Sequence, residues 1–189
     1  MRSRRSMPVM TERRPSRADV EGLLESATMA PTHHMTQPWR FIVLSGAARE
    51  SLGSAMGERV RRESAGDPHL EEKVRAEAAR PLRAPVVIAV VYTPSDHPKA
   101  VATEDRSSVG AAMQNILLAA HARGLATYLR TGPASLDPGV SAHLGLKPGP
   151  PPEEIAGFIY LGYAAQDPPP PKARTSASDL TEWRGWDQD

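Results

Sequence analysis

The sequence lacks cysteine, a clear excess of either charge and any long apolar run. Because no cysteine is present, the chain cannot form disulfides, thiolate metal sites or a cysteine nucleophile. Lysine and arginine number 23 against 22 aspartate and glutamate, so the formal charge of +1 predicts neither a nucleic-acid nor an anionic-membrane partner. No apolar stretch is long enough to span a bilayer, and no secretory core follows the basic start. We therefore expect a cytoplasmic protein.

Motifs for metal binding and hydrolysis are also missing. The chain has no H-E-x-x-H, G-x-S-x-G, Walker or G-x-G-x-x-G motif. His33 and His34 are adjacent, so their side chains are expected to diverge, and the other four histidines are isolated in the sequence. These are His69, His97, His121 and His143. The sequence therefore predicts no metal site, and it offers no nucleophile and base for a hydrolase.

The length of 189 residues predicts a single domain over residues 1–189 and is sufficient for a substantial core. A basic arm occupies residues 1–17, and a proline-rich tail occupies residues 166–189. Trp183 and Trp186 in this tail have large apolar areas, so we expect the tail to dock on another surface.

Helical and strand periodicities alternate along the chain. We predict helices over residues 16–30, 47–60, 107–124 and 137–144, and strands over residues 39–44, 85–92, 125–129 and 155–161. The continuous apolar run at 85–92 fits a strand buried on both faces. Mixed charges over residues 58–83 predict a solvated helical face. Met29 is predicted to pack in the core, and Gln114 and Asn115 to hydrogen-bond between helices.

Residues 30–41, A-P-T-H-H-M-T-Q-P-W-R-F, separate a helical pattern from a strand pattern. Pro31 ends the helix because it has no amide donor and clashes with the preceding turn. Two histidines, a threonine and a glutamine lie between the two elements, and all can hydrogen-bond a ligand. Polar connections between rigid elements are typical places for binding sites.

The order A-P-x-H-x-x-x-Q-P-W-x-F resembles the FMN-dependent nitroreductase-like oxidoreductases, in particular their small, stand-alone branch. The apolar helix that carries Gln114 and Asn115 and the element Leu129-Arg130-Thr131-Gly132 are also similar to that family. The resemblance implies an α+β fold, a three-layer sandwich with a central mixed sheet flanked by helices. It also implies a homodimer, with the C-terminal extension swapped across it.

The resemblance further implies an FMN site. The family carries R-R-S or R-x-S near its N-terminus and a basic K-x-R pair at the head of its tail, and both hold the FMN phosphate. His33 and Gln37 are implied to face the isoalloxazine or the nicotinamide, and Leu129, Arg130 and Thr131 to flank the flavin. The implied cofactor-binding residues are Arg4, Arg5, Ser6, His33, Gln37, Leu129, Arg130, Thr131, Lys172 and Arg174. Without the resemblance, each segment has a simpler interpretation. The basic arm and the Lys172–Arg174 segment also fit solvated charged segments, and the stretch after Leu129 also fits an ordinary turn.

The implied activity is ping-pong transfer of hydride from NADH or NADPH through flavin N5 to an electron-poor acceptor such as a nitroaromatic or a quinone. Because FMN carries the reactive atom, we assign no catalytic residue. One alternative is a flavin- or ligand-binding protein of the same fold without turnover. Another is a nucleic-acid binder that uses the basic arm, which predicts strongly salt-dependent binding.

Overall fold

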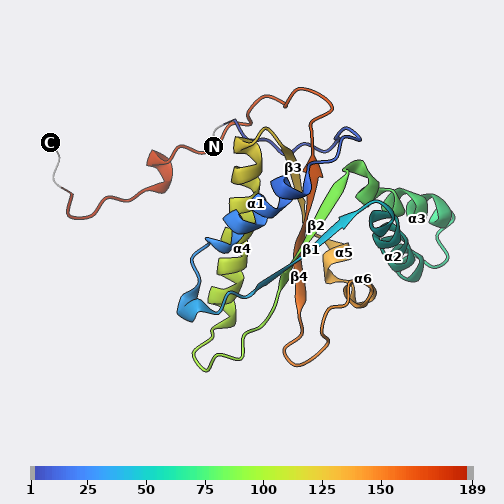
Figure 1. The fold of residues 1–189 in the computed structure, drawn as a ribbon, viewed down its shortest axis with the longest axis horizontal. Coiled ribbons are helices and arrows are strands. Elements are labelled where there is room, and N and C mark those ends of the chain that lie inside the picture. Colours follow the sequence, from blue (N-terminus) through green and yellow to red (C-terminus); the bar gives the residue numbers. More distant parts are fainter. Residues whose placement is uncertain (1–2, 187–189) are drawn as a thin grey trace.

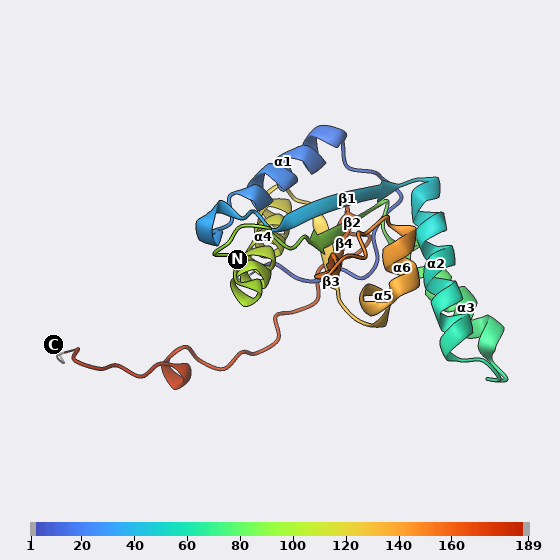
Figure 2. The same ribbon diagram turned by 90° about the horizontal axis from the view of Figure 1, so that it is seen from below.

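A four-stranded sheet in the order β1–β2–β4–β3 separates two layers of helices in the computed structural model, which describes residues 3–186 (Figures 1 and 2). The strands are β1 (Trp39–Ser45), β2 (Val86–Tyr92), β3 (Ala126–Arg130) and β4 (Glu154–Gly162). The predicted α+β sandwich is confirmed, and all four strands lie where the sequence patterns predict them.

The sheet is antiparallel at every pair of these strands, so the expectation of mixed pairing is wrong for β1 to β4. β2 and β3 each run antiparallel to β4 and are therefore parallel to one another, but β4 lies between them. Within residues 3–186, the parallel pairing is an isolated bridge between Ser6 and Thr127 of β3.

One layer consists of α1 (Arg17–Thr28) and α4 (Ala102–Ala122). Ser16 caps α1: its hydroxyl accepts from the Asp19 amide at 3.1 Å, and the Asp19 carboxylate accepts from the Ser16 amide at 3.1 Å. Leu23 of α1 and Ile116 of α4 are fully buried against the sheet. Met29 follows α1 with its side chain 77% exposed, so its predicted core role is wrong.

The other layer is built by α2, α3, the short helix η2, α5 and α6 (Figure 2). Their bounds are Ala47–Glu63, Leu70–Ala78, Arg80–Arg83, Pro133–Leu136 and Pro138–His143. Leu52 and Met56 of α2 pack on the same face of the sheet as Phe158. All seven residues of β2 are buried, which confirms the strand predicted to be covered on both faces.

The charged stretch over residues 58–83 is only partly solvated. Arg59 is 6% exposed and Glu77 is 7% exposed, and their guanidinium and carboxylate lie 3.5 Å apart between α2 and α3. Gly53 permits this packing, because a Cβ there would lie 2.2 Å from the Ala78 carbonyl oxygen. The buried pair corrects the prediction of a uniformly solvated face.

The tail leaves the folded body after β4 and extends away from it (Figure 1). Every residue from 166 to 186 is exposed, including the short helix η3 (Ser178–Leu180). Trp183 and Trp186 are 69% and 72% exposed, and their rings meet edge to face with centroids 5.5 Å apart. Among residues 3–186, no helix combines the length and the apolar character needed to cross a membrane.

Candidate functional site

The N-terminal arm and the tail meet beside β3 and enclose a cavity of about 900 Å³, which we call the basic cavity. It is lined by the five residues predicted to hold a phosphate: Arg4, Arg5, Ser6, Lys172 and Arg174. Four of these side chains are cationic, and no carboxylate lines the cavity within residues 3–186. Guanidinium groups bind oxyanions through paired hydrogen bonds, so the cavity suits a phosphate group.

Main-chain pairing explains how residues so distant in sequence come together. The Met7 amide donates to the Thr127 carbonyl at 2.9 Å, which holds the arm against the outer edge of β3. Farther along the arm, the Thr11 amide donates to the Tyr163 carbonyl at 2.9 Å. The arm therefore runs from β3 to the start of the tail and aligns both basic segments.

The basic cavity also has a neutral wall that the sequence analysis did not predict. Tyr128 of β3 and Gln114 and Leu118 of α4 line it, together with prolines of the arm and tail. Gln114 and Leu118 are four residues apart and so share one helix face, which is the signal that could have identified them. Asn115 behaves as predicted, because its side-chain amide donates to the Ser26 carbonyl of α1 at 3.1 Å.

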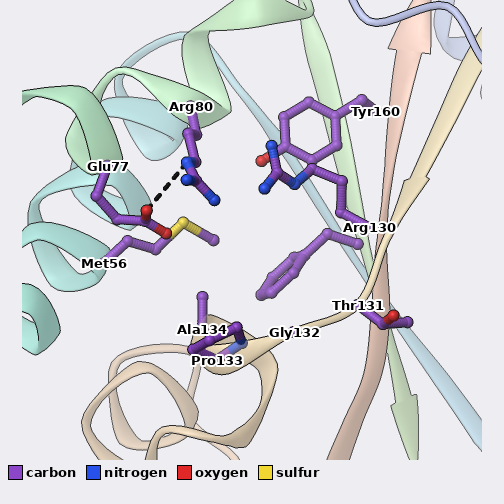
Figure 3. A pocket seen from close by; sticks show the side chains of 10 residues that line it. Met56, Glu77, Arg80, Arg130, Thr131, Gly132, Pro133, Ala134 and Tyr160 are labelled. Carbon is purple, nitrogen blue, oxygen red and sulfur yellow. Dashed lines mark ion pairs between the residues drawn. The ribbon is translucent and has the colours of Figure 1, made fainter.

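Leu129, Arg130 and Thr131 do not line the basic cavity. Leu129 packs against the core between the sheet and the α1–α4 layer. Arg130 and Thr131 instead line a second cavity of about 30 Å³, which we call the arginine pocket, and Figure 3 shows the Arg130 side chain directed into it and the Thr131 side chain directed away from it. Gly132 then turns the chain with φ at +145°, a backbone conformation that glycine adopts readily.

His33 and Gln37 lie at the opposite end of α4. His33 is in the short helix η1 (His33–Met35), and its Nδ1 pairs with the Glu104 carboxylate in the first turn of α4. The Gln37 amide donates to the Thr32 hydroxyl at 3.0 Å. The side chains of His33 and Glu104 line an open cavity of about 490 Å³.

This connection has an unusual backbone. His34, Met35 and Gln37 have φ values of 51°, 54° and 43°, which non-glycine residues rarely adopt. The Thr36 hydroxyl fixes the segment by donating to the Asp105 carboxylate at 2.6 Å. Strained backbone held by surrounding contacts is frequent at functional sites, which favours the prediction that this connection binds a ligand.

The histidines at this end are stacked rather than divergent. The ring centroids of His33 and His34 are 4.0 Å apart, and those of His34 and His97 are 5.2 Å apart. The positive φ of His34 brings its ring beside both neighbours, so the predicted divergence is wrong and His97 is not isolated. Within residues 3–186, no group of histidine, aspartate and glutamate side chains is arranged to hold a metal ion.

An ion pair between a half-buried arginine and a buried glutamate secures the sheet at the same end. Arg40 of β1 donates to Glu153 through Nη2 at 2.7 Å and through Nε at 3.1 Å. Burial acts to raise the pKa of Glu153, but hydrogen bonds from Arg40, the Lys147 amide and the Thr93 hydroxyl outweigh it and lower the pKa to about 2. The carboxylate therefore stays charged at neutral pH and acts structurally.

The helix α4 sets the distance between the two regions. Glu104 contacts His33, whereas Gln114 and Leu118 line the basic cavity. At 1.5 Å per residue, the separation along the helix is about 15 to 21 Å. The predicted cofactor residues of one chain therefore form separate groups.

Comparisons with known proteins identify the family. The profile of the Nitroreductase family matches residues 1–163. The chain belongs to the Nitroreductase family. The resemblance of the 30–41 stretch is thereby confirmed, and so is the expectation of an oxidoreductase enzyme. The match ends before Lys172 and Arg174.

Curated relatives carry nitroreductase names. The chain is 29% identical over 160 residues to "Putative NAD(P)H nitroreductase YdjA" of Escherichia coli strain K12, covering 85% of this chain and 84% of that protein. It is 28% identical over 179 residues to "Putative NAD(P)H nitroreductase YfhC" of Bacillus subtilis strain 168, covering 95% and 89%.

Solved structures share the fold over nearly the whole chain. A nitroreductase-like family protein from Bacillus cereus superposes with a TM-score of 0.83 at 27% identity, covering 97% of this chain and 92% of that one. A nitroreductase from Desulfovibrio desulfuricans, solved in complex with FMN, gives a TM-score of 0.72 at 25% identity, covering 98% and 94%.

Proposed function

We propose that this nitroreductase binds FMN in the basic cavity and passes hydride from NADH or NADPH to a small electron-poor acceptor such as a nitroaromatic or a quinone. The observation that carries the proposal is the convergence of Arg4, Arg5, Ser6, Lys172 and Arg174 on one cavity without a carboxylate in its described lining. The FMN complex of the Desulfovibrio desulfuricans relative supports the choice of cofactor.

The basic residues hold the phosphate of the cofactor. Arg4 and Arg5 provide guanidinium donors, Ser6 provides a hydroxyl donor, and Lys172 and Arg174 close the cavity from the tail. The position of the arm against β3 orders three of these five residues before the cofactor binds, which lowers the entropic cost of binding.

The neutral wall orients the flavin ring. Tyr128 and Leu118 offer apolar surface, and the Gln114 side chain offers one donor group and one acceptor. The main chain of residues 129–131 flanks the ring, while the Arg130 side chain points into the arginine pocket. Bound FMN supplies the N5 atom that takes hydride from the reductant and delivers it to the acceptor.

A homodimer completes the site. A flavin bound in the basic cavity is about 15 to 21 Å along α4 from the His33 end of the same chain, so the partner subunit's His33 and Gln37 face its ring. The fully exposed tail, with its two unburied tryptophans, reaches across to the other copy. Burial of the Trp183 and Trp186 rings at a subunit interface removes their apolar surface from water and so stabilises the dimer.

An absorbance spectrum of the purified protein tests this function. We expect flavin bands that bleach when NADPH or NADH is added without oxygen and that return when a quinone or nitroaromatic is added. Bands that persist with both reductants would indicate a flavin-binding protein without turnover. The absence of flavin bands after incubation with FMN would refute the assignment of the basic cavity.

A further inference from the structure

The arginine pocket has features that the proposed flavin chemistry does not use. It lies between α2, α3, η2, β3, β4 and α5 (Figure 3). It shares no lining residue with the basic cavity. Arg80, Arg130, Tyr160 and the Glu77 carboxylate form its polar side, and Met56 and Phe158 contribute apolar side chains. Figure 3 shows the two guanidinium groups and the Tyr160 ring directed toward the same space.

Arg130 has no acceptor for its guanidinium group among residues 3–186. Other arginines of the fold have such an acceptor: Arg40 pairs with Glu153, Arg62 with Asp137 and Arg106 with Glu154. The Arg130 guanidinium lies near the Tyr128 ring, whose centroid is 5.9 Å from Cζ. A half-buried guanidinium without a counterion is poorly stabilised, since burial weakens its hydration.

Arg80 pairs with a carboxylate through one side of its guanidinium group. Its Nε donates to Glu77 at 2.9 Å, and Figure 3 shows the terminal nitrogens of Arg80 directed into the pocket. Glu77 also faces Arg59 at 3.5 Å, and Arg59 has a second counterion in Glu63. The carboxylates of Glu63 and Glu77 thus balance Arg59 and Arg80, and neither balances the charge of Arg130.

Tyr160 adds a neutral donor. Its side chain is 3% exposed, and its hydroxyl has no hydrogen-bond partner among the described residues. Burial raises the pKa of Tyr160, and the nearby charges of Arg130 and Arg80 only oppose this effect. The phenol therefore keeps its proton at neutral pH and can donate to a bound acceptor.

We propose that the arginine pocket binds the oxyanion group of a small ligand, a carboxylate or a phosphate. The Glu77 carboxylate in the lining is already engaged by Arg80 and Arg59. The groups that remain for a ligand, two guanidinium groups and one phenol, are donors, which complements oxygen atoms that carry negative charge. The volume of about 30 Å³ admits such a group but not a whole cofactor. The apolar side chains of Met56 and Phe158 suit a ligand with a nonpolar body next to the anionic group.

Calorimetric titration of the full-length protein at low ionic strength tests this proposal, with inorganic phosphate and benzoate as separate probes. We expect at least one probe to bind saturably. Tighter binding of phosphate identifies a phosphate ligand, and tighter binding of benzoate identifies a carboxylate. Arg130→Gln should weaken binding roughly tenfold, and Tyr160→Phe should weaken it by a smaller factor.

Two control variants define what overturns the proposal. Arg83→Gln removes the same charge from η2 at an exposed position that does not line the pocket. Its charge reaches Tyr160 only through a solvent-screened Coulomb interaction, so it should change affinity less than about twofold. Lys172→Gln combined with Arg174→Gln alters only the basic cavity. Absence of saturable binding, equal weakening by Arg83→Gln and Arg130→Gln, or loss of binding in the Lys172 and Arg174 variant would each overturn it.

Discussion

The two ends of α4 differ in how their polar groups are satisfied. At the C-terminal half, four cations face a cavity without a carboxylate in its described lining. An anionic ligand can supply the counterion that the lining lacks. At the N-terminal end, His33 and Thr36 already pair with Glu104 and Asp105 of α4. The first region suits an anion, whereas the polar groups of the second are already paired within the chain. The proposed site uses both regions, and in our proposal two copies of the chain join them.

Removing charge from the basic cavity should produce the largest effect. Lys172→Gln combined with Arg174→Gln should weaken FMN binding about 100-fold. Each substitution removes a hydrogen bond to a charged group, which is stronger than a neutral one, and a loss of about 1.4 kcal/mol lowers the affinity tenfold. Fluorescence titration with FMN measures this change.

Arg184→Gln is the matched control, because Arg184 is an exposed tail residue that pairs with Glu182 and does not line the cavity. We expect its FMN affinity to stay within about twofold of wild type. Equal losses of FMN affinity in the double variant and in Arg184→Gln would mean that the tail acts through its total positive charge and not through Lys172 and Arg174 in particular.

Breaking the Arg40–Glu153 pair should destabilise the opposite end without changing phosphate binding. We expect Arg40→Gln to lower the free energy of unfolding by about 2 kcal/mol at pH 7, because it leaves a buried carboxylate with fewer donors. Denaturant unfolding measures this loss, and FMN titration of the same variant should give wild-type affinity.

The same pair gives a pH dependence. The pKa of Glu153 is lowered from 4.5 to about 2 in the folded protein, so its stabilising contribution is complete above about pH 4.5 and is lost as the pH falls toward 2. Arg40→Gln should make the unfolding free energy less sensitive to pH over this interval. An unchanged slope would contradict the role assigned to Glu153.

The hydroxyl of Thr36 should have a smaller effect. Thr36→Val leaves the Asp105 carboxylate, which belongs to a residue 2% exposed, without its side-chain donor at 2.6 Å. We expect a loss of about 1 kcal/mol in unfolding free energy. Thr28→Val, at an exposed position where the hydroxyl donates only to the Glu25 carbonyl, should cost less than about 0.5 kcal/mol.

A substitution within α4 between the two regions should have the smallest effect and the opposite sign. A Cβ at Gly110 meets nothing within 4 Å, so Gly110→Ala should stabilise the protein by about 0.5 to 1 kcal/mol through helix propensity. Gly132→Ala is the contrast: its surroundings are equally open, but its φ of +145° makes alanine unfavourable. Thermal unfolding of both variants separates the two cases.

Local patterns were sufficient to predict the strands and the ends of α1. The continuous apolar run at 85–92 predicted a buried strand, and the helix predicted over residues 16–30 agrees with α1 and its Ser16 cap. The start of α4 was predicted at residue 107 but lies at Ala102, because the polar first turn gives no apolar periodicity. Contacts with Thr36 and His33 hold that turn in place.

Features that depend on contacts between residues far apart in the sequence could not be predicted from local sequence patterns. Arg59 and Glu77 have the same local spacing as solvated charges, and only the packing of α2 on α3 buries them. Arg130 was expected beside the flavin, but alternation along β3 turns its side chain into the arginine pocket. Its role in cofactor binding stays a prediction, as do those of His33 and Gln37.

Subunit complementation tests most directly the claim that one site is built from two copies. One variant carries Lys172→Gln and Arg174→Gln, and the other carries His33→Ala and Gln37→Ala, with different affinity tags so that mixed dimers can be purified after coexpression. Each variant alone should lose most NADPH-oxidising activity. A mixed dimer contains one intact site and should recover about half of the wild-type activity per dimer. If the mixed dimer is no more active than the mean of its parents, each site lies within one chain and the account is wrong.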